Sequence, residues 1–322
     1  MPHWTVDAPT RIAFDDVTSL KVRTIAGSVA VLATSETPSL DITKIVGKPL
    51  SVTHEDGVLT ISYEDLTWDG LLEWLRPRNH SAEMTVTVPR DCPAQVGVIA
   101  ATAIVSGIAA RTSVKSVSGA ITLDGVAGGI DASTVAGDVE AQDLSGRVTF
   151  NSVSGDLTLA GGSVDHLDAK TVSGSVTADV DLASKGGMRV ATVSSDVALR
   201  LPASSNARVD LRSTSGRVLS EFGGLRATHS PASHVVSGTL GAGSGRISVT
   251  TLSGRVTLLR RGQRGASGTP AYSTDTGSTQ TGMKPGTAQA RTGHEEDTWA
   301  AATDTEPPTG ARDGAQTEGE AR

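Results

Sequence analysis

The feature that most constrains the fold is a short sequence that recurs through the second half of the chain. KSVSGAITL at 115–123 is followed by SVSGDLTL at 152–159, TVSGSVTA at 171–178 and TLSGRVTL at 251–258. Successive markers in these units are 16 to 22 residues apart. Repeats of this length are typical of solenoids, in which each unit buries its apolar side chains only against its neighbours. The markers are Gly119, Gly137, Gly155, Gly174, Ser195, Gly216, Gly238 and Gly254.

Each repeat has the apolar period of a β-strand. In a regular strand, Val117, Gly119, Ile121 and Leu123 share one face, and Val153 and Val172 begin the same alternation in later copies. The segments between the copies are too short for helices. We therefore expect a single-stranded β-helix with coils of about 18–21 residues over residues 101–261, stacked about 4.8 Å apart. The glycine permits either a sharp bend or a close backbone approach, and the preceding serine either stacks or bonds the backbone.

Residues 1–100 form a second region, which we expect to be β-rich. Asp56-Gly57 separates two alternating runs, which is a strong signal for a hairpin. Within this region, Trp68, Leu71, Leu72 and Leu75 follow the spacing of one helix face. We predict a short amphipathic helix near 68–76 that caps the sheet. The alternative is a finger that contacts a partner or a membrane through Trp68 and Trp74.

The last region, 262–322, has no apolar period and is rich in Gly, Thr, Ala and Pro. Such a segment cannot bury enough apolar surface to offset chain entropy, so we expect it to be disordered. Aromatic residues make up only 3 % of the whole chain, which argues against a thick core.

Charge and targeting signals limit the classes of partner. The net charge is −7, and from residue 265 onward nine acidic residues outnumber four basic ones. The rest of the chain is therefore nearly neutral, and we expect no nucleic-acid partner. Cys92 is the only cysteine, which excludes an internal disulfide. We find neither a signal peptide nor an apolar run long enough to span a membrane, so the sequence predicts a cytoplasmic protein.

The residues that follow the marker glycines are the candidate contact positions. Asp138 and Asp156, with Asp196 in a later copy, would form an acidic column that is broken by Ala120, Ser175 and Arg217. Arg217 and Arg255, with Arg246, would form a basic stripe near the C-terminal end of the coils. Exposed surface charge is the simpler interpretation of both groups. We find no catalytic constellation, metal-ligand spacing or cofactor motif, and expect no enzyme activity, metal or cofactor.

The V-S-G-x-V/L-x-L units, preceded by the strand from Met84 to Pro89, resemble the bacterial putative-adhesin β-strand-repeat family. The resemblance covers about residues 11–260. It implies a single-stranded β-helix of unknown biochemical function, without catalytic residues, and often a link to the cell envelope or surface.

The leading hypothesis is a non-enzymatic β-solenoid that acts as an adhesin-like interaction scaffold, with an unknown protein or envelope component as its partner. Two alternatives remain open. One is a carbohydrate-binding or carbohydrate-active β-helix that uses the Asp138 and Asp156 column. The other is a peripheral envelope-associated protein that uses the segment from Trp68 to Leu75.

Overall fold

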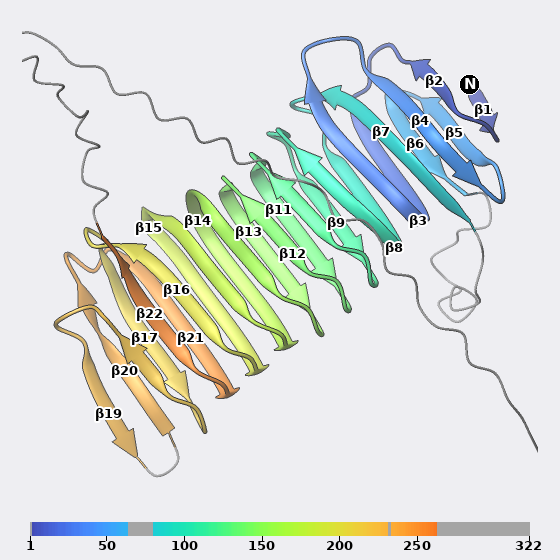
Figure 1. Cartoon of the computed structure of the whole chain (residues 1–322). Helices are drawn as coiled ribbons and strands as arrows, with labels where there is room; N and C mark the ends of the chain where they lie inside the picture. Colours follow the sequence, from blue (N-terminus) through green and yellow to red (C-terminus); the bar gives the residue numbers. More distant parts are fainter. Residues whose placement is uncertain (1, 64–79, 231–232, 263–322) are drawn as a thin grey trace, which may run out of the picture. The chain divides into compact units, whose positions relative to one another are not determined.

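The computed structural model describes residues 2–63, 80–230 and 233–262, which form 22 β-strands and no helix (Figure 1). The all-β repeat fold predicted from the sequence is therefore confirmed. The short helix predicted near 68–76 lies outside the described residues, so that detail is not borne out. Contacts group residues 1–267 into one compact unit, and the description below concerns this unit.

The middle of the chain forms coils that stack in chain order, and each coil adds one strand to each of two parallel sheets. In sheet I, Ile130 pairs with Thr112 of the preceding coil and Val148 of the following one. Sheet I contains β9 (Thr112–Ser116), β11 (Ala127–Thr134), β13 (Ser145–Ser152) and the second parts of β14 (Leu157–Ser173) and β15 (Val176–Ser194). Sheet II contains β10 (Ile121–Asp124), β12 (Val139–Gln142), the first parts of β14 and β15, and β16 (Val197–Pro202).

Each coil turns twice between the sheets. The chain passes from sheet I to sheet II at the Ser-Gly units, which we call the Ser-Gly corner, and returns at a second corner. The second corner is longest in β15, where the pairing with β14 jumps from Leu182 to Gly187. Residues 183–186 have no partners there and form an added loop.

At the N-terminal end, the chain order and the stacking order differ. β3 (Ser19–Thr34) pairs in parallel with β6 (Val58–Ser62) and β7 (Ser81–Pro89) on one side and β8 (Ala94–Ser106) on the other. The predicted Asp56-Gly57 hairpin is confirmed, with positive φ angles of 50° and 75°. β8 crosses the boundary expected at residue 100. Antiparallel strands complete this end: β5 (Leu50–Glu55) and β1 (His3–Val6) extend sheet I, and β4 (Ser39–Val46) and β2 (Thr10–Ala13) extend sheet II.

The chain order and the stacking order also differ at the C-terminal end. β21 (Gly245–Ser253) lies between β15 and β17 (Ala207–Ser213), and β22 (Val256–Arg261) lies between β16 and β18 (Val218–Ser220). The last coil in the sequence, formed by β21 and β22, therefore stacks between the β15–β16 coil and the β17–β18 coil, although both come earlier in the chain. β20 (Ser233–Leu240) and β19 (Arg226–Ser230) then pair antiparallel beyond β17. Gly238 was expected as a repeat marker, but it lies inside β20 because this segment forms a hairpin rather than a coil.

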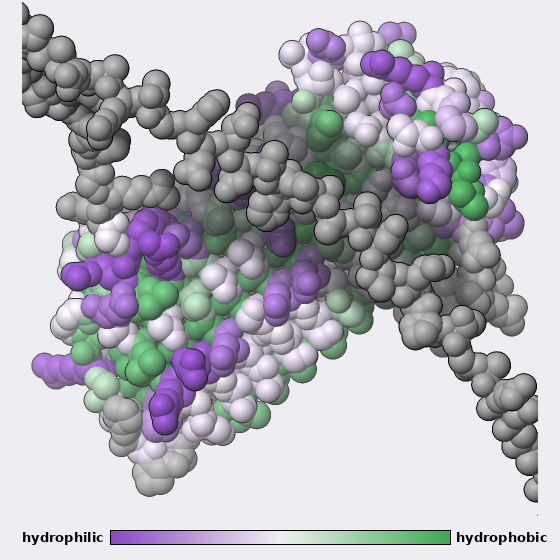
Figure 2. Space-filling view, viewed as in Figure 1, coloured by the Kyte–Doolittle hydropathy of each residue, from purple (hydrophilic) through white to green (hydrophobic). Residues whose placement is uncertain are grey.

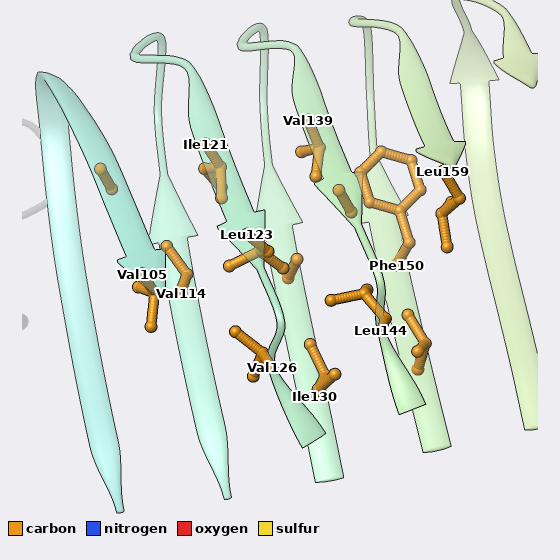
Figure 3. Close-up of a cluster of buried hydrophobic side chains, with 14 of the residues drawn as sticks. Val105, Val114, Ile121, Leu123, Val126, Ile130, Val139, Leu144, Phe150 and Leu159 are labelled. Carbon is orange, nitrogen blue, oxygen red and sulfur yellow. The ribbon is translucent and has the colours of Figure 1, made fainter. Parts of the chain in front are cut away.

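The core between the sheets is narrow and almost wholly aliphatic. Val114 and Ile130 from sheet I lie with Ile121 and Leu123 from sheet II, and Phe150 is the largest side chain in this cluster (Figure 3). The exposed and buried positions alternate along the strands, as the sequence period predicts. Full burial of each such aliphatic side chain stabilises the fold by roughly 1.5–3 kcal/mol relative to exposure.

The alternation breaks at the Ser-Gly corner, which corrects one expectation. Val153 and Val172 were expected on the same face as the buried leucines and valines that follow them. They are instead 52 % and 48 % exposed. In a regular strand, residues on one face are separated by an even number of positions. The buried residues Ser152 and Leu157 are five positions apart, because the bend at Gly155 inserts an additional residue between the two strands.

Candidate functional site

The marker glycines lie in one column along the Ser-Gly corner, where the backbones of neighbouring coils approach closely. A Cβ atom added to Gly119 would lie 1.8 Å from the carbonyl oxygen of Ala101, and one on Gly137 would lie 2.1 Å from that of Gly119. Neither residue has a left-handed φ. Close approach therefore explains these two glycines, whereas the sequence left bending as an equal alternative. The column continues through Gly155, Gly174, Ser195, Gly254 and Gly216, in that stacking order.

A second column along this corner consists of buried hydroxyl groups, and the sequence analysis missed it. The residue three positions before every corner marker is Ser or Thr. Ser116 Oγ donates to the carbonyl oxygen of Gly119 at 2.7 Å, and Thr134 Oγ1 accepts from the Gly137 N–H at 2.8 Å. The signal was visible in the sequence as an unbroken series. Its members are Ser116, Thr134, Ser152, Thr171, Thr192, Thr251 and Ser213.

The serine directly before the glycine bonds to the neighbouring coil. Ser118 Oγ donates to the carbonyl oxygen of Ile99 at 3.2 Å, and Ser173 Oγ donates to that of Val153 at 3.3 Å. These bonds join residues 19 and 20 positions apart. The Ser-Gly pair therefore helps to hold one coil against the next.

The candidate aspartates and arginines at this corner lie in one column rather than in two groups. Backbone pairing gives the order Asp138, Asp156, Ser175, Asp196, Arg255, Arg217. Asp138 Oδ1 accepts from the Asp156 N–H at 2.9 Å, and Asp156 Oδ1 accepts from the Ser175 N–H at 2.7 Å. These carboxylates therefore join adjacent coils. Trp68 and Trp74, the other candidate contact residues, lie outside the described residues.

A row of exposed aliphatic side chains also follows the Ser-Gly corner. Its members precede the corner serine or alanine, and their exposed fractions lie between 45 % and 54 %. They are Val135, Val153, Val172, Val193 and Leu252. Figure 2 shows the stacked coils with rows of hydrophilic, pale and hydrophobic side chains running along them.

The outward side of sheet I carries a concave site that we call the cationic depression. Its volume is about 770 Å³. One row of its lining consists of paired residues on five adjacent strands, Arg147, His166, Gly187, Arg246 and Arg208. Gly187 has no side chain, so the middle of this row is open. Six cationic side chains line the depression: Arg147, Lys170, Lys185, Arg189, Arg208 and Arg246.

Two loops border the cationic depression. Lys185 and Gly186 belong to the added loop of the second corner, and Gly243 and Ser244 belong to the glycine-rich turn before β21. Arg208 lies along this turn, since a Cβ on Gly243 would be 3.5 Å from Arg208 Cγ. Arg246 was predicted in a basic stripe with Arg217 and Arg255, but it lies in the depression, directly after this turn at the start of β21.

Most of the charge in the cationic depression is uncompensated. Among the described residues, Asp168 is the only acidic one in its lining, and its Oδ1 lies 3.5 Å from Lys170 Nζ. Within residues 2–63, 80–230 and 233–262, the other five cations form no ion pair with a carboxylate. Clustered cations of one sign raise the local potential and concentrate anions near the surface. The depression is therefore suited to an anionic ligand.

His166 reaches the depression through an irregularity in β14. The segment Asp165-His166-Leu167-Asp168 contains a dense cluster of polar residues in the sequence. It lies inside β14, where the pairing register shifts between Val164 and His166. The shift leaves His166 in the cationic row, while Leu167 remains buried in the core.

Metal-binding clusters and the single thiol were considered as reactive groups among the described residues. No three His, Cys, Asp or Glu side chains lie close enough there to hold a metal ion. Burial raises the pKa of the Cys92 thiol to about 11, so the thiol stays protonated at neutral pH. In the described part of the chain, no helix is long and apolar enough to cross a membrane.

Comparison with known proteins identifies the family. The sequence profile described as Toastrack DUF4097 matches residues 48–259. This match confirms the resemblance to the β-strand-repeat family seen in the sequence. A search of curated proteins found no match.

Solved structures with a similar fold come from several bacteria. A putative adhesin from Bacteroides fragilis is 12 % identical, with a TM-score of 0.35, over 79 % of this chain and 96 % of the other. A putative cell adhesion protein from Clostridium sporogenes is 11 % identical, with a TM-score of 0.24, over 79 % and 100 %. A putative lipid binding protein from Parabacteroides distasonis is 10 % identical, with a TM-score of 0.30, over 78 % and 96 %. At these values the likenesses carry no argument about function.

Proposed function

This chain belongs to the Toastrack DUF4097 family, and we propose that it is a non-enzymatic, adhesin-like scaffold that binds an anionic partner in the cationic depression. The observation that supports this proposal is the convergence of six cations and one carboxylate on the outward side of sheet I. The cations come from β13, β14, β15, β17 and β21, which parallel pairing holds at fixed spacing. A rigid sheet positions such groups more accurately than a loop would.

The rival interpretation, a carbohydrate-active site at the aspartate column, has less support. Such a site needs carboxylates that are free to exchange protons with a substrate. One oxygen each of Asp138 and Asp156 already accepts a backbone N–H of the next coil. The third interpretation depends on the segment from Trp68 to Leu75, which lies outside the described residues.

Neutralising the depression tests the proposed function. The variant Arg147→Gln/Arg189→Gln/Arg246→Gln removes three exposed cations from the depression. A matched control, Arg90→Gln/Arg217→Gln/Arg255→Gln, removes three exposed cations elsewhere, including both corner arginines predicted as contacts. Binding of dextran sulfate, a generic polyanion, is measured by calorimetry at low salt, and thermal melting checks that both variants fold.

We expect the depression variant to bind at least about tenfold more weakly, because each lost contact of a charged pair contributes on the order of 1 kcal/mol. The control should stay within about twofold of the unaltered protein, since screening weakens the effect of distant charges. Equal losses in the two variants would mean that only net charge matters, and the proposal would fail.

A further inference from the structure

We propose that the ligand of the cationic depression is a linear acidic polysaccharide that runs across the strands, along the stacking direction. This inference rests on the proposed function and adds the chemical class of the ligand and its orientation. The first argument is the length of the cationic row. Arg147 and Arg208 occupy the two ends of five paired strands, so their backbones are separated by about 19 Å, or four strand spacings. A single phosphate or one sugar cannot contact both ends.

The second argument is the shape of the site. The loop that contains Lys185 and the turn that contains Ser244 border a hollow whose centre is open at Gly187. A flat bilayer surface would rest on the borders and leave the floor unfilled. A flexible polymer chain can enter the hollow and run alongside the two loops, which adjoin each other at the ends of neighbouring strands.

The third argument is the mixture of groups in the lining. Thr149, Ser244 and Ser248 add hydroxyl groups beside the cations, and glycines leave backbone accessible. The cations of the depression can pair with the anionic groups of an acidic polysaccharide, and its hydroxyls can form hydrogen bonds with the sugar hydroxyls. No Phe, Tyr or Trp lines the depression, so it lacks the platform on which single-stranded nucleic acids stack their bases.

The open centre of the row provides a sharp test of orientation. A Cβ at Gly187 would meet His166 Cδ2 at 3.5 Å, which is an ordinary contact, and Gly187 has no left-handed φ. Gly187→Ala should therefore fold. Gly223→Glu, which adds a carboxylate outside the depression where a Cβ meets nothing within 4 Å, should bind within about twofold of the unaltered protein. Gly187→Glu places a carboxylate in the middle of the row and should weaken binding at least about tenfold, through repulsion of the anionic chain. Melting curves confirm folding.

The ligand class is tested with galacturonate oligomers of increasing length, which carry one carboxylate on every sugar. We expect affinity to rise at least about tenfold from the disaccharide to the octasaccharide, as more carboxylates contact the cations, and to level off once the chain exceeds about 19 Å. Single-stranded DNA of matched charge should bind more weakly than the octasaccharide.

The outcomes separate the two proposals. If the disaccharide binds as tightly as the octasaccharide, or DNA binds as tightly as either, the polysaccharide inference is wrong. Unchanged oligosaccharide binding by Gly187→Glu would contradict the path across the strands. In each of these cases, dextran sulfate binding that is lost only in the depression variant would still support the proposed function. If the unaltered protein binds neither dextran sulfate nor any oligosaccharide, both proposals fail.

Discussion

The middle coils and the two ends of the solenoid are built from the same strands but are assembled differently. From β9 to β16, each coil stacks on the one before it in the chain. At the ends, β3 and the β21–β22 coil are inserted out of order, and antiparallel strands follow them. The middle therefore needs only local neighbours, whereas each end joins segments that are distant in sequence.

The difference has a physical reason. A coil in the middle has both sheet edges paired, but a terminal coil would expose unpaired N–H and C=O groups to another chain. Insertion fixes the last coil between two others, and the β19–β20 hairpin then pairs along the outer edge of sheet I. Loop closure over a longer distance costs entropy, but that cost grows only slowly with loop length.

The largest predicted effect is removal of the inserted C-terminal coil. Truncation after residue 244 deletes β21 and β22, the only parallel partners of β17 and β18 in the described structure. We expect β17 to β20 to lose protection from hydrogen exchange while β9 to β13 keep theirs, because middle coils depend only on neighbours. Truncation after residue 262 retains both strands and serves as the control. If β17 kept its protection from hydrogen exchange after truncation at residue 244, the inserted topology would be wrong.

The next effect concerns close stacking in the middle. Gly119→Ala would place Cβ 1.8 Å from the Ala101 carbonyl oxygen, so neighbouring coils must separate. We expect a loss of about 2–4 kcal/mol in the free energy of unfolding, measured by denaturant titration. Gly129→Ala is the matched control, since its Cβ would meet only Arg111 Cγ at 3.9 Å, and it should change stability by less than about 0.5 kcal/mol. Equal effects of the two substitutions would refute the stacking argument.

A smaller effect separates two members of the buried hydroxyl column. Thr134 Oγ1 accepts the Gly137 N–H, so Thr134→Val leaves that buried donor unpaired and should cost about 1–3 kcal/mol. Thr192 Oγ1 is buried and has no hydrogen-bond partner among the described residues. Thr192→Val should therefore be neutral or stabilising. Denaturant midpoints of the two variants provide the measurement, and a larger loss for Thr192→Val would reverse our assignment.

The sequence was sufficient for the middle but not for the ends. Alternating residues such as Ile121 and Leu123 predict strands, and the spacing of the glycines predicts coils. The coils present similar Val and Leu side chains and, except at Ser195, the same corner glycine, so nothing in the local sequence at Gly254 indicates that it stacks between Ser195 and Gly216. The insertion follows from whole-chain packing, which no local pattern encodes.

The cationic depression was only partly visible in the sequence. Arg246 follows a glycine and was predicted as part of a basic stripe with Arg217 and Arg255, and Arg147 also follows a glycine. Arg208 and Lys185 have no such signal, because one lies in the displaced β17 and the other in an added loop. Charges that converge only through stacking order cannot be grouped until that order is known.

Cys92 provides a pH-dependent comparison near the N-terminal end. Burial raises its pKa to about 11, from the ordinary thiol value of 9.0. Between these two pH values the unfolded state loses the thiol proton and the native state retains it, so stability falls as pH rises. Below about pH 9 the thiol has no such effect. We expect the free energy of unfolding to fall more steeply above pH 9 in the unaltered protein than in Cys92→Ala, and parallel profiles would contradict this.

The smallest effect concerns the exposed side of the Ser-Gly corner. Val153 is 52 % exposed, whereas Leu157, four residues later, is 2 % exposed. Val153→Thr should change the free energy of unfolding by less than about 0.5 kcal/mol, because the side chain has little burial to lose. Leu157→Ala should cost about 2–5 kcal/mol, since it removes a packed core side chain and leaves a cavity. A regular strand through the corner would bury both residues, so similar losses at the two positions would argue against the bend at Gly155.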